Sequence, residues 1–287
     1  AYNWLPDPAT TACFLVQPSG LNSNFNLLWH ERCRGMIDVF GHSIELDYRI
    51  GVVIACVCLG GFIRGFTGFG SALAIIPSLA MIFSPREAVA MHAVMEVPVI
   101  LSMAATAARG AKRSVIAPML AGLVVATPAG ALVLAVTRPD VMKIAISLVV
   151  LGMVVLLYMR GSLKLNLSGP AAAVAGVIGG IFQGATGVGG PPVVTALLAR
   201  GDASAQTRAN IFTVMSAMIV MSILSFWWLG LFTPIVLVFG AIAAPFCVGA
   251  TWAGARWFGR GGDTHFQKAV LGLLVVLSLI TLATTLS

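Results

Sequence analysis

Two glycine-rich motifs in this sequence have the residue types and spacing needed to bind a small anion through the protein backbone. Glycines break helices, and each motif is followed by a short apolar run that can start a new one. The first turn of a helix presents free N–H groups and a partial positive charge. Two such starts would bind an anion without a charged ligand, and threonine hydroxyls would add donors. The candidate residues are Gly65, Thr67, Gly68 and Gly70 in the first motif and Gly184, Thr186, Gly187, Gly189 and Gly190 in the second.

The two motifs are copies of each other. Residues 60–70 align without gaps on residues 179–189 at an offset of 119 residues, and six of the eleven positions are identical. The alternative explanation for the glycines is close packing, because small residues let membrane helices approach each other. Helix-breaking segments at matching places in two halves of a chain are, however, typical of a transporter's substrate site. We therefore favour a binding site at the two motifs.

Arg64 is a second candidate for anion binding, because it lies inside an apolar segment and within the first motif. A charge at that depth is costly and usually faces the protein interior, and a guanidinium matches the geometry of an oxyanion. Two alternatives remain open, an ion pair with Glu96 and a side chain that extends to the membrane surface. The second motif has Gln183 at the matching position, which would line the site with a neutral donor.

His92 and Glu96 are spaced by four residues and so lie on one face of a helix. A titratable pair at this spacing could relay a proton that is coupled to transport. Alternatively, Glu96 neutralises Arg64 and His92 is an ordinary interfacial residue. One glutamate and one histidine are too few for a catalytic set at this depth, so we do not expect an enzyme, a metal site or a cofactor.

The elements that position these residues are apolar helices of a membrane protein. The chain has 287 residues, of which 59% are hydrophobic and only 9% are charged, too few to cover a globule in water. We predict an all-α integral membrane fold with about ten apolar segments, of which 71–84 and 190–199 are shorter than the ~20 residues that cross a bilayer. The ten are 50–66, 71–84, 88–108, 114–137, 141–159, 170–187, 190–199, 208–229, 233–255 and 268–286.

The loop charges predict how these segments are oriented. Alternate loops carry ten Lys and Arg residues against three in the remaining loops, and the richer set is expected in the cytoplasm. Segments 50–84 and 170–199 then form glycine-broken hairpins that enter from opposite sides. This arrangement predicts two inverted repeats, with both termini in the periplasm. The positive charges follow the membrane topology, and no nucleic-acid-binding motif accompanies them.

Residues 1–49 form a polar leader, residues 50–168 the first membrane repeat and residues 169–287 the second. The leader contains Pro6, Pro8 and Pro18 and no uninterrupted apolar core, so we do not expect a secretory signal peptide. Met36 begins a stretch that runs into the first membrane segment. Whether residues 1–35 are native sequence or an upstream extension is left open.

The stretches GFIRGFTGFGSALAIIPSLAMIFSP at 61–85 and GGIFQGATGVGGPPVVTALLARG at 179–201 resemble the signature halves of the sulfite exporter TauE/SafE family of membrane permeases. The resemblance extends over most of residues 50–286. It implies duplicated membrane helices and the transport of sulfite, sulfonates, sulfoacetate or related organosulfur anions, by export or by uptake.

The expected function is therefore secondary transport of a small sulfur-containing anion across the bacterial inner membrane. The chain has no Walker motif, and an ion gradient of protons or sodium is the expected drive. The alternatives are a membrane-embedded enzyme and a passive anion channel. The expected partners are the anion, the coupling ion and membrane lipid, and assembly into a homo-oligomer is left open.

Overall fold

The computed structural model describes residues 36–39, 42–45, 48–67, 69–107, 112–159, 169–202 and 204–258. The chain divides into two compact units, residues 1–52 and residues 53–287. In the first unit, β1 (Met36–Val39) and β2 (His42–Glu45) pair antiparallel, with Ile37 opposite Ile44. The sequence pattern does not predict this short hairpin.

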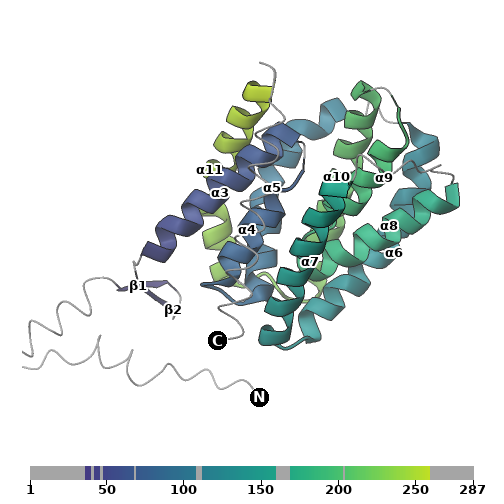
Figure 1. The fold of residues 1–287 in the computed structure, drawn as a ribbon. Helices are drawn as coiled ribbons and strands as arrows, with labels where there is room; N and C mark the ends of the chain where they lie inside the picture. Colours follow the sequence, from purple (N-terminus) through teal and green to yellow (C-terminus); the bar gives the residue numbers. More distant parts are fainter. Residues whose placement is uncertain are drawn as a thin grey trace, which may run out of the picture. The chain divides into compact units, whose positions relative to one another are not determined.

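Helices account for the regular structure that the described residues form from residue 48 onward, which confirms the prediction of a helical membrane protein (Figure 1). Their bounds follow nine of the ten predicted segments closely, and segment 268–286 lies outside the described residues. The helices are α3 (Tyr48–Thr67), α4 (Ser71–Ala80), α5 (Pro85–Ala107), α6 (Arg113–Val136), α7 (Pro139–Met159), α8 (Gly169–Thr186), α9 (Gly190–Ala199), α10 (Ser204–Trp228) and α11 (Pro234–Phe258).

Several helix ends follow from local sequence. Ser84 and Glu87 form a reciprocal cap at the start of α5, in which the Glu87 carboxylate accepts hydrogen bonds from the Ser84 N–H and hydroxyl. Proline occupies the first position of α5, α7 and α11, where its missing N–H is not needed. Arg86 donates to the backbone oxygens of Leu134 and Thr137 and so satisfies the carboxyl end of α6.

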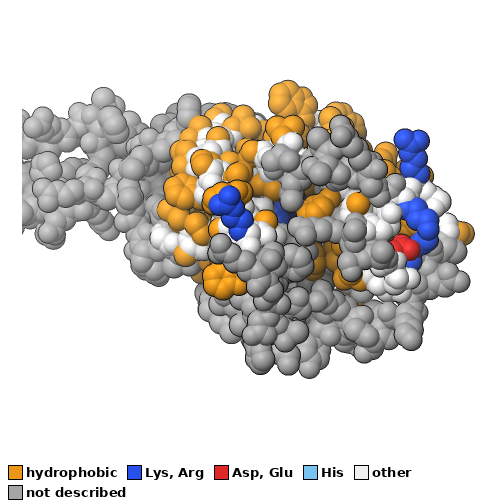
Figure 2. Space-filling model, turned by 90° about the horizontal axis from the view of Figure 1, so that it is seen from above, with side chains coloured by type: hydrophobic (Ala, Val, Ile, Leu, Met, Phe, Trp, Pro, Cys, Tyr) orange, Lys and Arg blue, Asp and Glu red, His pale blue; other side chains and the backbone are white. Residues whose placement is uncertain are grey.

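Three helices of the described part are long and apolar enough to cross a membrane, namely α6, residues 209–228 of α10 and residues 234–257 of α11. Their outer faces carry exposed apolar side chains, such as Val125 (76% exposed) and Trp228 (74% exposed). Figure 2 shows hydrophobic side chains over much of the described surface in that view, with lysine and arginine at few places. An apolar exterior of this kind fits a lipid environment.

The long helices pack through glycine. On α6 and α8, glycines bring the two backbones into direct contact, and a Cβ added at Gly176 would lie 2.0 Å from the backbone oxygen of Met119. Gly122 and Gly130 of α6 make equally close approaches to α8. On α3, Gly61 faces α11, where its Cβ would lie 2.7 Å from the backbone oxygen of Cys247. Small residues thus allow both helix pairs to approach closely.

Candidate functional site

The two glycine motifs interrupt the helices where the sequence predicts. The first motif separates α3 from α4, and the second separates α8 from α9. Gly70 has a φ of 95° and Gly187 a φ of 71°, a left-handed conformation that glycine adopts without steric cost. Gly68 and the side chain of Thr67 lie outside the described residues.

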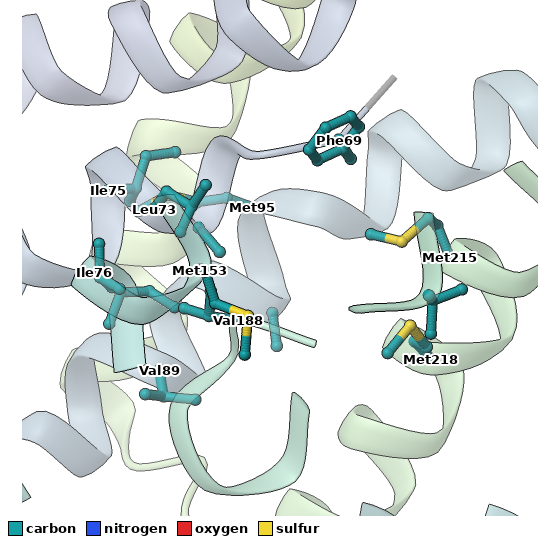
Figure 3. Packing of buried hydrophobic residues seen from close by; sticks show 14 of the residues in the cluster. Phe69, Leu73, Ile75, Ile76, Val89, Met95, Met153, Val188, Met215 and Met218 are labelled. Carbon is teal, nitrogen blue, oxygen red and sulfur yellow. The ribbon is translucent and has the colours of Figure 1, made fainter. Parts of the chain in front are cut away.

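The starts of the two short helices lie next to each other. A Cβ added at Gly190, the first residue of α9, would be 3.8 Å from the Cβ of Phe69, two residues before α4. A Cβ added at Gly187 would be 2.4 Å from Cδ1 of Ile76 in α4. Figure 3 shows Phe69 and Val188, one from each break, in the buried cluster that also holds Met215. Two segments 119 residues apart in sequence thus meet inside the protein.

The first break holds a buried ion pair. Nη1 of Arg64, at the end of α3, is 2.6 Å from Oε2 of Glu96 in α5. Arg64 is 4% exposed and Glu96 is fully buried. This is the ion pair that the sequence left open as one of the alternatives for Arg64. The Nε of Arg64 has no hydrogen-bond partner among the described residues, so the guanidinium retains donor capacity for a further acceptor.

Ser71 and His92 complete this cluster. The hydroxyl of Ser71, the first residue of α4, donates to Oε1 of Glu96 at 2.6 Å and lies 3.2 Å from Nε2 of His92. His92 Nε2 is 3.4 Å from the same carboxylate oxygen, and its side chain is buried. Spacing alone placed His92 and Glu96 on one face, but it did not identify Ser71. The signal for Ser71 is its position directly after Gly70, where a helix starts.

The second break is held by neutral groups. The side-chain oxygen Oε1 of Gln183 accepts a hydrogen bond from the N–H of Gly189 at 3.1 Å. The hydroxyl of Thr186 donates to the backbone oxygen of Phe182 at 2.8 Å and accepts from the Val188 N–H at 3.4 Å. In this conformation the Thr186 proton is therefore used within its own helix, and Gln183 stabilises the turn.

The two helix starts differ in the number of N–H groups they offer. Helix α9 begins Gly190-Pro191-Pro192, and the two prolines have no N–H. Helix α4 begins Ser71-Ala72 after Gly70, and both residues carry an N–H. The α4 start is therefore the stronger donor of the two.

Some of the predicted site glycines serve helix packing. A Cβ at Gly65 would lie 1.9 Å from the backbone oxygen of Thr251 in α11, and a Cβ at Gly184 would lie 2.1 Å from that of Thr127 in α6. Gly189 likewise faces the backbone oxygen of Gly179 and the Cε of Met218. Close packing, the alternative explanation for the glycines, therefore accounts for the need for glycine at these three positions.

A comparison with protein-family models matches residues 53–281 to the sulfite exporter TauE/SafE. The chain belongs to this family. Its membership makes the protein a membrane transporter of sulfite or related anions. The match begins at residue 53, where the second compact unit also begins. No curated protein and no solved structure matches the chain.

Proposed function

We propose that this TauE/SafE protein is a secondary transporter that binds one small sulfur-containing anion, such as sulfite, a sulfonate or sulfoacetate, between its two helix breaks. The observation that carries the proposal is that the α4 and α9 starts meet beside the buried Arg64, whose Nε–H has no hydrogen-bond partner among the described residues. Helix starts and a guanidinium both favour an anion. The proposed lining is Arg64, Gly65, Thr67, Gly68, Gly70, Gln183, Gly184, Thr186, Gly187, Gly189 and Gly190.

The packing of the long helices supports two inverted repeats. The offset of 119 residues pairs Gly65 of α3 with Gly184 of α8, and it pairs most of α6 with α11. Gly65 packs on α11 and Gly184 packs on α6. The first helix of each half therefore packs on a helix of the other half, and the two contacts correspond to each other. Such reciprocal contacts are expected if the halves are related by a twofold axis, and an axis in the membrane plane supports alternating access.

Orientation in the bacterial inner membrane, with both termini in the periplasm, is tested by labelling. Ser114, at the start of α6, and Asp140, at the start of α7, are exposed and lie at opposite ends of one predicted crossing. With the native cysteines replaced by alanine, Ser114→Cys should resist a membrane-impermeant maleimide added to intact cells, whereas Asp140→Cys should react. The reverse pattern would overturn the orientation.

Transport itself is tested by counterflow in proteoliposomes. Vesicles preloaded with unlabelled sulfite, methanesulfonate or sulfoacetate should accumulate the labelled form of the same anion transiently, with saturable kinetics and with the anion unchanged. Flux without saturation or counterflow would indicate a channel, and chemical alteration of the anion would indicate an enzyme. Either result would contradict the proposal.

The role of Arg64 is tested with a neutral residue at position 96 in both of the variants compared. Arg64→Gln alone would leave Glu96 buried without its partner, and that cost would confuse the result. The comparison is therefore between Glu96→Gln and the double variant Arg64→Gln/Glu96→Gln. We expect anion binding in the first and an affinity about 100-fold lower in the second. Arg256→Gln, which removes an exposed arginine stacked on Trp252, is the matched control and should bind as the native protein does.

A further inference from the structure

We infer that the Glu96 carboxylate occupies the anion position on Arg64 in the substrate-free protein, so that the transported anion enters together with one proton that Glu96 takes up. This inference rests on the proposed function and names its coupling ion. Among the described residues, Glu96 is the only acidic side chain that forms an ion pair with Arg64. Its Oε2 lies 2.6 Å from Nη1 of the guanidinium. A carboxylate and a sulfur oxyanion present the same kind of oxygen acceptors to a guanidinium.

The charge balance of the cluster explains why a proton must accompany the anion. Arg64 and Glu96 together are neutral, and both are buried. An added anion would leave one uncompensated negative charge in a buried site, which is costly. Once the anion has taken Glu96's place on Arg64, the carboxylate is a buried charge without its partner and binds a proton from solvent. The cluster with the anion and the proton is neutral again.

The surroundings of Glu96 fit this exchange. Among the described residues, its charged or titratable neighbours are Arg64 from α3, His92 from α5 itself and Cys247 from α11. Helix α4 contributes the Ser71 hydroxyl, which does not titrate in the physiological range. Within the described part of the chain, α6, α7 and α10 give Glu96 no hydrogen bond or ion pair.

Ser71 and His92 keep the carboxylate in reach of Arg64 in either form. When Glu96 is ionised, its Oε1 accepts from Ser71. When it is protonated, its O–H can donate to Nε2 of His92, which lies 3.4 Å from the same oxygen. His92 is thus a positioning residue, and the proton resides on Glu96. Anion and proton then cross the membrane in the same direction.

Calorimetry with methanesulfonate tests the inference, because this anion does not titrate near neutral pH. Binding heats measured in buffers of different ionisation enthalpy give the number of protons taken up per anion. We expect about one for the native protein, with a Kd that rises about tenfold per pH unit, because the anion-bound state holds one more proton than the free state. With sulfite, which titrates itself, the difference between native protein and Glu96→Gln gives the same number.

Variants at Glu96 and His92 show which of the two residues takes up the proton. Glu96→Gln should bind the anion without proton uptake and with a Kd that changes less than twofold between pH 6 and pH 8. Glu96→Asp and His92→Gln should both retain uptake of about one proton. Loss of uptake in His92→Gln would move the proton to His92 and overturn the assignment to Glu96. The measurement on native protein decides the main point even if Glu96→Gln does not fold.

The two proposals fail in different ways. Anion binding that depends on Arg64 but takes up no proton overturns this inference and leaves the transport site standing. Proton uptake that persists in Glu96→Gln has the same consequence. If the native protein binds none of methanesulfonate, sulfite or sulfoacetate, the proposed site and this inference both fall.

Discussion

The two helix breaks share one backbone plan and differ in chemistry. In the first break, Arg64, Ser71 and Glu96 form a buried cluster at the start of α4, held by the Arg64–Glu96 ion pair and the Ser71–Glu96 hydrogen bond. The residues at the matching positions of the second break, 119 residues later, are Gln183, Gly190 and Met215. None of them is charged. The glycine framework thus occurs in both breaks, whereas charged side chains occur at these positions in only one.

The contacts made by the second set show how the neutral break is held. Gln183 bonds to the Gly189 N–H of its own turn, and Gly190 lies against the end of Met215, whose Cε would be 3.0 Å from an added Cβ. Packing and local hydrogen bonds, which also include that from the Val188 N–H to the Thr186 hydroxyl, therefore hold this break. A helix break of this kind is thus held without charged side chains in the second half, which is consistent with the binding role proposed for the charges of the first break.

The largest expected effect comes from the feature that both breaks share. In Gly65→Leu or Gly184→Leu, the new side chain would meet backbone atoms of α11 or α6, which cannot move as a side chain can. We expect little folded protein from either variant, measured by size-exclusion chromatography in detergent. Gly152→Ala, at a site with nothing within 4 Å of an added Cβ, should fold normally. A well-folded Gly184→Leu protein would contradict the packing described here.

The next largest effect is a difference in anion affinity between variants of the charged first break and of the neutral second break. The double variant Arg64→Gln/Glu96→Gln should lose anion affinity about 100-fold relative to Glu96→Gln, the amount expected for one charged hydrogen-bonding partner. Gln183→Met, in the neutral break, should lose less than about tenfold, since a neutral hydrogen bond contributes less. Equal losses in titrations of the purified protein would show that both breaks bind the anion to the same extent.

A smaller effect distinguishes the two corresponding long helices. Gly130 in α6 and Gly249 in α11 occupy matching positions, 119 residues apart. A Cβ added at Gly130 would lie 2.2 Å from the backbone oxygen of Ile181, whereas a Cβ added at Gly249 would meet nothing within 4 Å. Gly130→Ala should cost about 1–3 kcal/mol, whereas Gly249→Ala should be neutral or stabilise by up to about 1 kcal/mol. Melting temperatures in detergent provide the comparison, and equal shifts would indicate that α6 and α11 pack alike.

The smallest expected effect converts one break toward the other. Ser71→Gly, which imitates Gly190, removes a hydrogen bond to the Glu96 carboxylate and should cost about 1 kcal/mol, because the carboxylate keeps its ion pair with Arg64. Gly190→Ser places its new Cβ against the flexible end of Met215 and should cost less. Thermal melts of the two reciprocal variants test this order, and a larger loss in Gly190→Ser would reverse the comparison.

Much of the helical fold could be predicted from the sequence, because apolar length and charge placement determine where a chain crosses lipid. The α8–α9 break illustrates this, since glycines, Pro191 and the end of the apolar run coincide there. The pairing of Arg64 with Glu96 was one of several open alternatives, because spacing along one helix says nothing about which neighbour it meets. The helix expected at 268–286 and the role expected for Gly68 remain predictions, because these residues lie outside the part of the chain that the structure describes.

Other features depend on contacts between distant segments and could not be predicted. A glycine that admits a ligand and a glycine that admits a neighbouring helix look alike in sequence, and Gly65 and Gly184 turn out to contact helices. Ser71 was missed because its partners come from α5, and a lone serine after a glycine has no periodic pattern. The left-handed glycine of the first break, Gly70, matches Gly189, which has a φ of −84°. Identity in an alignment thus does not ensure identical conformation.

The contact between Gly65 and α11 has a consequence for biosynthesis. The partner of α3 is encoded about 170 residues after it, so the ribosome has nearly finished the described helices before this glycine face can be covered. An N-terminal half released by itself would leave the Gly61 and Gly65 face of α3 without the helix that packs on it. Two half-length polypeptides, split between α7 and α8 and produced in the same cell, should therefore rescue one another, whereas each made alone should be degraded.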